Sequence, residues 1–112
     1  MNKSIITKYD NYSVISGTPK DCDHHLIFGR GMRKLAEEDG IWIPVTNEEH
    51  NMSSRGLIYQ IHENPMAESL SKICGQLAWE KEYLARLCEM PFYEVKDEAR
   101  EEFRKRYGRS FL

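Results

Sequence analysis

The sequence predicts one small domain of the α+β class. The first half alternates short apolar runs with glycine turns and brief helix signals, whereas the second half has the three- and four-residue apolar spacing of helices. A length of 112 residues suits one domain and is too short for two. We divide the chain into a strand-and-helix unit with an irregular N-terminal segment, 1–64, and a helical extension packed on it, 65–112.

The first elements are short. Residues 1–20 are polar and irregular, with one short strand expected around Tyr12–Ile15. Asp23–Phe28 is an apolar strand that ends at a Gly-Arg-Gly turn. Met32–Asp39 is predicted as a helix, and Gly40 follows it in the position where glycine often ends helices.

A second strand and a helix start come next. Ile41–Val45 is β-branched and aromatic, and Pro44 confines it to a sheet edge or a strand end because proline cannot donate to the ladder. Thr46-Asn47-Glu48-Glu49 combines a cap with acidic first-turn residues, so a helix that includes His50 begins here.

The second half is predicted as two helices. The first runs from Pro65, capped by Asn64, to Met90 before Pro91. The second covers Asp97–Tyr107, after which Gly108 closes it and a short tail folds back. The first helix has an apolar face made of Leu70, Ile73, Leu77, Leu84 and Leu87. Either this face packs on Ile41, Ile43 and Val45, which we expect of a chain that needs its own core, or helix 65–90 pairs with a second copy to give a homodimer.

Composition excludes several classes of protein. No apolar run approaches the roughly 20 residues of a membrane span, and the N-terminus lacks a signal-peptide pattern. Three cysteines without a Cys-x-x-Cys pair indicate reduced thiols, so we expect a cytoplasmic protein without membrane contact. The formal net charge of −2 gives no general attraction to nucleic acid.

All four histidines fall between residues 24 and 62. Neighbouring residues on a strand point in different directions, so His24 and His25 suit one metal ligand and one base. His50, in the first turns of the next helix, can complete a metal site from the other side. The alternatives are a satisfied polar pair at a strand end and a solvated helix histidine. Cys22 is near these residues, but a small buried thiol is its expected role.

These residues resemble a known family. Asp23-His24-His25-Leu26-Ile27, the intervening Trp42-Ile43-Pro44-Val45-Thr46, and Glu49-His50-Asn51 are similar to the HNH endonuclease motif, the ββα-metal or His-Me finger of homing endonucleases, colicin DNases and many phage nucleases. Phe28-Gly29, Arg33-Lys34-Leu35, Glu38-Asp39-Gly40-Ile41 and the ending from Lys105 to Leu112 resemble small HNH-type proteins of phages and prophages. The similarity covers most of the chain from about residue 12 onward.

The resemblance implies a fold and a set of roles. The fold is a ββα-metal hairpin and helix followed by C-terminal helices, inside a bacterial host cell. His25 is the general base that polarises water for attack on a DNA phosphodiester, and His24 and His50 are metal ligands. His62 lies where related phage proteins carry a Gly-Val-His-like element, so it is the candidate third ligand. The implied cofactor is one divalent ion, namely magnesium, manganese or zinc, and the implied partner is DNA.

Two departures from the family and two alternatives remain. Ser13–Gly17 stands where many relatives have a Cys-x-x-Cys-Gly knuckle, so no structural zinc is expected there. Ser54 stands where colicin-type DNases have another histidine. The leading interpretation is a metal-dependent endonuclease or nickase. The second is a non-catalytic metal-finger protein that binds DNA or a host protein, such as an inhibitor of a host defence nuclease. The third is a structural accessory factor in phage DNA processing.

Charged and polar neighbours of the motif have two interpretations each. The basic residues that can meet DNA phosphates are Arg30, Arg33, Lys34 and Arg55. Several glutamates lie among them, so an ordinary mixed surface is the alternative. Asp23 is either a partner that fixes a histidine tautomer or a carboxylate in solvent.

Overall fold

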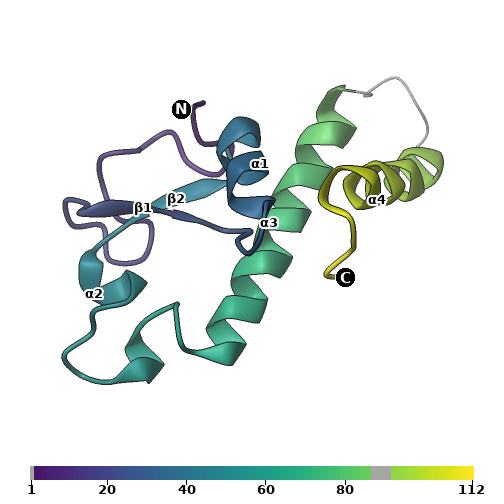
Figure 1. Ribbon diagram of the computed structural model, residues 1–112. Helices are drawn as coiled ribbons and strands as arrows, with labels where there is room; N and C mark the ends of the chain where they lie inside the picture. Colours follow the sequence, from purple (N-terminus) through teal and green to yellow (C-terminus); the bar gives the residue numbers. More distant parts are fainter. Residues whose placement is uncertain (1, 87–91) are drawn as a thin grey trace.

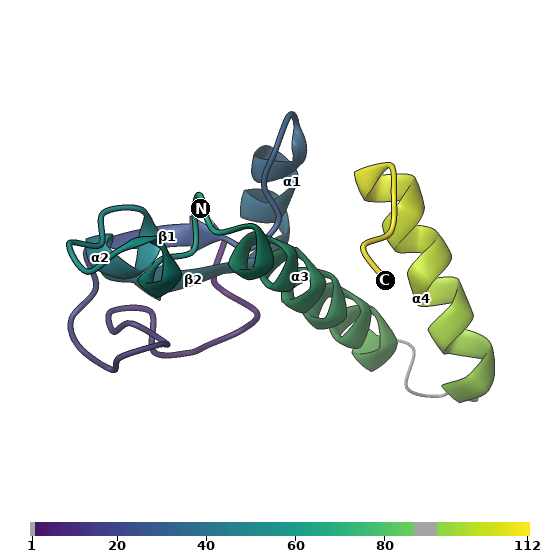
Figure 2. The same ribbon diagram turned by 90° about the horizontal axis from the view of Figure 1, so that it is seen from below.

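The computed structural model describes residues 2–86 and 92–112 and confirms the α+β class. In chain order the elements are β1 (Cys22–His25), α1 (Met32–Asp39), β2 (Trp42–Val45), α2 (Asn47–His50), the 3₁₀ helix η1 (Leu57–Tyr59), α3 (Pro65–Arg86) and α4 (Phe92–Tyr107). Figure 1 shows the hairpin and α2 on one side of α3 and α4 on the other. Figure 2 shows α4 running back beside α3, on which it packs. No helix of the described residues is long and apolar enough to cross a bilayer.

The two strands form an antiparallel hairpin with α1 inserted between them. Cys22 pairs with Val45 and His25 with Trp42, and the Leu26 amide extends the pairing by donating to the Ile41 carbonyl at 3.1 Å. The strand predicted over 23–28 is too long, because β1 ends at His25. The strand predicted around Tyr12–Ile15 is wrong. Residues 14–16 form a turn instead, and an isolated bridge pairs Tyr12 with Pro19 across it.

Several predicted helix ends are confirmed. Gly40 ends α1 in the left-handed conformation, and its amide bonds back to the last turn. Thr46 caps α2 in a capping box, with its hydroxyl accepting from the Glu49 amide and the Glu49 carboxylate accepting from the Thr46 amide. Asn64 caps α3 by accepting from the Ala67 amide. Helix α4 begins earlier than the predicted Asp97, and the predicted end of α3 at Met90 lies outside the described residues.

The core joins both halves of the chain. The hairpin, α1 and α4 supply its buried members, which are Leu26, Ile27, Ala36, Ile41, Ile43, Val45, Phe103 and Tyr107. Phe103 stacks on Tyr107, with ring centroids 4.5 Å apart, and no part of its side chain is exposed. Residues from the hairpin region and from α4, near the end of the chain, therefore share one core.

The buried face of α3 differs from the predicted one. Its buried residues are Ser71, Gly75, Gln76 and Glu80. Leu70 and Leu77 are 53% and 51% exposed, so the prediction that they pack on the β2 residues is wrong. Gly75 explains the difference, because a Cβ built there would lie 2.8 Å from Cγ1 of Ile27. The helix approaches the hairpin so closely that only small or hydrogen-bonded side chains fit between them. Leu87 lies outside the described residues, and the pairing of α3 with a second copy stays a prediction.

The C-terminal tail folds back as predicted. The amide oxygen of Gln76, a residue with no exposed surface, accepts from the Phe111 amide at 2.6 Å. Its amide nitrogen donates to Glu80 at 2.8 Å and to Ser110 at 2.9 Å. Glu80 also pairs with Arg100 of α4 at 3.2 Å. One buried side chain therefore ties α3 to the tail and, through Glu80, to α4.

The two sides of α3 predict opposite responses to substitution. Gly75→Val forces carbon into the contact with Ile27 and should cost about 1–3 kcal/mol of unfolding free energy or more. Leu77→Asp, at a solvent-facing position, should cost less than about 1 kcal/mol. Urea unfolding followed by circular dichroism measures both. If Leu77→Asp unfolds the protein and Gly75→Val does not, the buried and exposed faces of α3 are assigned the wrong way round.

Candidate metal centre

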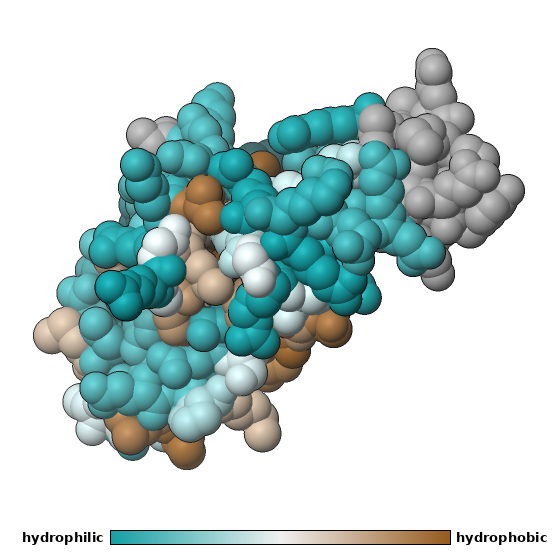
Figure 3. All heavy atoms as spheres, turned by 45° about the vertical axis from the view of Figure 1, so that its right-hand side comes forward, coloured by the Kyte–Doolittle hydropathy of each residue, from teal (hydrophilic) through white to brown (hydrophobic). Residues whose placement is uncertain are grey.

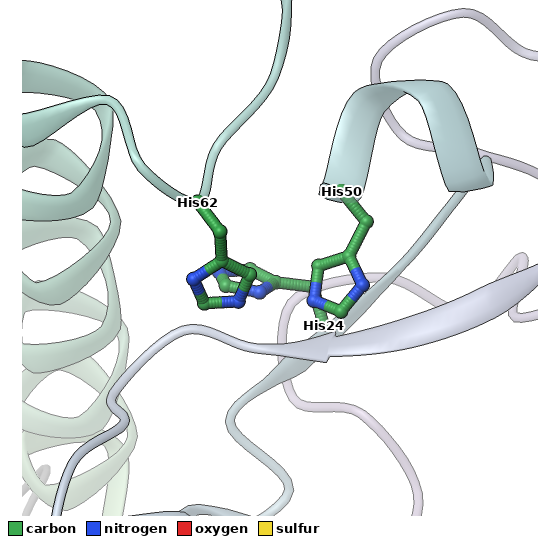
Figure 4. A group of neighbouring side chains, drawn as sticks. All are labelled: His24, His50 and His62. Carbon is green, nitrogen blue, oxygen red and sulfur yellow. The ribbon is translucent and has the colours of Figure 1, made fainter. Parts of the chain in front are cut away.

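Three histidines from three separate segments meet in one pocket. His24 comes from β1, His50 from the end of α2 and His62 from the segment after η1, and Figure 4 shows the three rings turned toward one another. One potential ligand atom from each lies within 4.8 Å of the others. Ring centroids are 5.1 Å apart for His24 and His50, 5.1 Å for His24 and His62, and 4.6 Å for His50 and His62. The structure thus brings together the three residues that the sequence nominated as ligands.

Backbone pairing places these side chains. The ladder sets His24 opposite Ile43, and the capping box fixes the short helix that ends at His50. The chain then returns so that the His62 amide donates to the His50 carbonyl at 2.9 Å and the Ile61 amide to the Glu49 carbonyl at 2.8 Å. His62 is therefore held beside His50 by main-chain bonds that do not depend on its ring.

The hydrogen bonds of His24 decide which of its nitrogens is available. The Ser71 hydroxyl donates to the Leu26 carbonyl at 2.7 Å, and the same oxygen lies 2.8 Å from Nε2 of His24. Since the hydroxyl proton is used, Nε2 must carry the hydrogen and donate to Ser71. Nδ1 of His24 is then a bare acceptor, and it is buried with no hydrogen-bond partner among the described residues. An unpartnered buried acceptor costs stability unless something binds it.

The other two rings are held in a similar way. Nδ1 of His62 lies 3.2 Å from a carboxylate oxygen of Glu68, and Nδ1 of His50 lies 3.6 Å from the Cys22 sulfur. In both residues Nε2 remains for an ion. Histidine ligands usually make such a bond with the second nitrogen, which sets the tautomer and the ring orientation. Among the described residues, Asp23 makes no hydrogen bond that would fix a histidine tautomer, and its carboxylate pairs with Lys20 at 2.9 Å.

The pocket favours neutral imidazole. Burial, followed by the neighbouring histidines, lowers the pKa of His24 to about 3. Burial also lowers the pKa of His50, with smaller contributions from His62 and Arg33. Neutral imidazole is the form that binds metal. Three nitrogen donors match zinc or another transition metal, whereas magnesium prefers oxygen donors.

His25 is turned away from the three histidines, as expected of the next residue on a strand. It is 7% exposed, and its Nε2 has no hydrogen-bond partner among the described residues. The nearest carboxylate oxygen, of Glu37 on α1, lies 3.8 Å away. Burial and then Arg33 lower the pKa of His25, against an opposite effect of Glu37. The ring is thus a neutral base near pH 7, with a carboxylate beside it that the sequence did not identify.

The four predicted phosphate contacts are all exposed. Within the described part of the chain, Arg30, Arg33, Lys34 and Arg55 make no ion pair. The positive charge of Arg33, on α1, lowers the pKa of both His25 and His50. Arg55 instead lies over the ring of Tyr59, with its guanidinium carbon 4.4 Å from the ring centroid. Arg33 is therefore the basic residue whose field reaches both the base and the candidate metal pocket.

The turn that follows Ser13 is held by the hydroxyl of that residue. Ser13 is buried, accepts from the amides of Ile15 and Ser16, and donates to the Glu49 carboxylate at 2.6 Å. Burial alone raises the pKa of Glu49, but these bonds from Ser13 and Thr46 outweigh it and lower the pKa. The N-terminal turn is thus fixed to α2 one residue before His50.

Sequence reasoning missed Ser71, Glu68, Glu37 and Ser13. Glu68 and Ser71 are three residues apart on α3 and so lie on one helical face, next to Gly75. The signal that could have identified Glu68 and Ser71 was a row of small and polar residues on a helix whose apolar residues lie on another face. Comparison of the chain with protein-family models, with curated proteins and with solved structures finds no match.

The Ser71 hydroxyl predicts a measurable effect on metal affinity. Ser71→Ala removes the acceptor that fixes the His24 tautomer, so zinc affinity should fall roughly 10- to 100-fold. Ser69→Ala, two residues earlier at an exposed position, is the matched control and should leave affinity unchanged. Competition with a chromogenic chelator measures both variants. Equal affinities would mean that Ser71 has only a packing role.

Proposed function

We propose that this protein is a metal-dependent HNH-type DNA endonuclease or nickase, encoded by a phage or prophage. The observation that carries the proposal is the pocket of His24, His50 and His62 with a neutral, unpartnered imidazole, His25, next to it in the chain. One side chain of the pair faces the metal pocket and its neighbour faces α1. That division is what hydrolysis needs, because a ligand and a base must reach different atoms of one phosphodiester.

The order of the elements supports a ββα-metal finger. The hairpin supplies His24 from its first strand, and the helix directly after its second strand supplies His50. Helix α1 replaces the hairpin loop, and His62 supplies the third imidazole that Ser54 does not. The pocket would then offer three protein ligands and one open position, the arrangement of catalytic metal sites.

The proposed roles follow from the chemistry of hydrolysis. A divalent ion held by His24, His50 and His62 would supply Lewis-acid chemistry at the phosphate. His25 takes a proton from the attacking water, whose oxygen forms the new bond to phosphorus while the bond to the leaving oxygen breaks. Glu37 lies beside the imidazole that becomes charged, and Arg33 holds the negative phosphate near it.

A second candidate is a metal-finger protein that binds DNA or a host protein without cutting. The observations that favour it are the net charge of −2 and the 7% exposure of His25, which restricts the approach of water to the base. Both candidates use the same histidine pocket. They differ in whether His25 acts as a general base in DNA cleavage.

Two adjacent substitutions separate ligand from base. His25→Ala should abolish nicking of supercoiled plasmid, a loss of at least about 100-fold, while zinc affinity stays nearly unchanged. His24→Ala should lose both, because it removes a ligand. Gel assays with zinc, manganese and magnesium measure nicking, and chelator competition measures affinity. A wild-type protein that binds the metal yet nicks no DNA with any of the three ions would favour the second candidate.

A further inference from the structure

The segment between two of the candidate ligands, residues 51–60, is a loop with a fixed base. Its ends are held by the main-chain bonds that join His62 to His50 and Ile61 to Glu49. Inside the base, the buried Gln60 side chain accepts from the Ser53 amide at 3.0 Å and donates to the His62 carbonyl at 2.8 Å. The tip is therefore kept at a set position relative to the histidine pocket.

The tip of this loop is apolar and faces solvent. Ile58 is 78% exposed and Leu57 51%, and Met52 and Tyr59 are exposed as well. The Asn64 side chain donates to the Leu57 carbonyl at 3.2 Å, which ties η1 to the start of α3. Figure 3 shows hydrophobic residues at the bottom of the molecule, the end at which Figure 1 draws this loop. A group of large apolar side chains held out in water indicates a surface that a partner covers.

Charge narrows the kind of partner. Residues 51–60 contain no aspartate or glutamate, although the chain as a whole carries a net charge of −2. Their one charged residue is Arg55, whose guanidinium carbon lies over the Tyr59 ring, 4.4 Å from its centroid. An apolar tip with a cation beside it fits a polyanion that has an apolar interior. Duplex DNA has this chemistry, with phosphates outside and stacked bases inside.

We propose that the loop inserts Leu57 and Ile58 between base pairs of duplex DNA, next to the phosphate that the histidine pocket receives. Arg55 then contacts the backbone beside the opened step. Since the candidate metal ligands His50 and His62 flank the loop, the insertion sets the distance from the opened step to the scissile phosphate. This inference rests on the proposed nuclease function and names its substrate as a duplex distorted at the cut.

Binding is tested apart from cleavage in the His25→Ala background. Fluorescence anisotropy with a labelled duplex and zinc gives the Kd of this parent, of Leu57→Ser/Ile58→Ser and of Leu77→Ser. The Leu57→Ser/Ile58→Ser variant should bind the duplex at least about tenfold more weakly than the parent. Leu77→Ser, equally exposed but on the outer face of α3, should bind within about twofold of the parent. Equal binding by the parent and the loop variant, or no duplex binding by the parent, overturns the proposal.

Insertion itself is tested with 2-aminopurine, whose fluorescence rises when it is unstacked. The parent should brighten duplexes that carry the probe, and Leu57→Ser/Ile58→Ser should not. A parent that binds without brightening any probe position overturns insertion. Plasmid nicking separates this result from the wider proposal. If Leu57→Ser/Ile58→Ser leaves the nicking rate of the otherwise wild-type protein unchanged, the nuclease proposal stands and the loop proposal fails. If DNA binding depends on the loop but the wild-type protein does not nick, the loop proposal stands and the nuclease proposal fails.

Discussion

The hydroxyl of Ser71 makes the contact on which the rest of the pocket depends. It donates to the carbonyl of Leu26, at the point where the chain leaves β1, and it accepts from Nε2 of His24. One side chain therefore satisfies a backbone acceptor that the sheet leaves unpaired and assigns the His24 tautomer. Because Ser71 belongs to α3, the helix outside the hairpin determines what the hairpin presents to an ion.

Close approach of α3 to the hairpin makes this contact geometrically available. Gly75, one turn after Ser71, lets the helix backbone reach Ile27 and Ile41, so serine is long enough to bridge to the strand. The same closeness excludes leucine from this face, and Leu70 and Leu77 are turned to solvent. Gln76 and Glu80 complete the face with bonds to the tail and to α4. Packing and site geometry are thus set by the same helix.

Local signals made parts of this structure predictable. Helix ends were predictable because capping involves only residues that are neighbours in sequence, as at Thr46, Asn64 and Gly40. The different directions of the His24 and His25 side chains were predictable because side chains alternate along a strand. The face of α3 was not predictable in this way, because apolar spacing marks an amphipathic helix but does not say that a nearby backbone leaves room only for glycine and serine. Glu68, Glu37 and Ser13 were missed for a related reason, since each contacts a residue in a different segment of the fold.

The most direct measurement is anomalous diffraction from crystals of the zinc-loaded protein, collected on both sides of the zinc absorption edge. We expect one anomalous peak bonded to Nδ1 of His24 and to Nε2 of His50 and His62, at about 2.0–2.1 Å each. Nε2 of His24 should still face Ser71. A peak elsewhere, or zinc bound through Nε2 of His24 with the Ser71 contact broken, would contradict a pocket organised by α3.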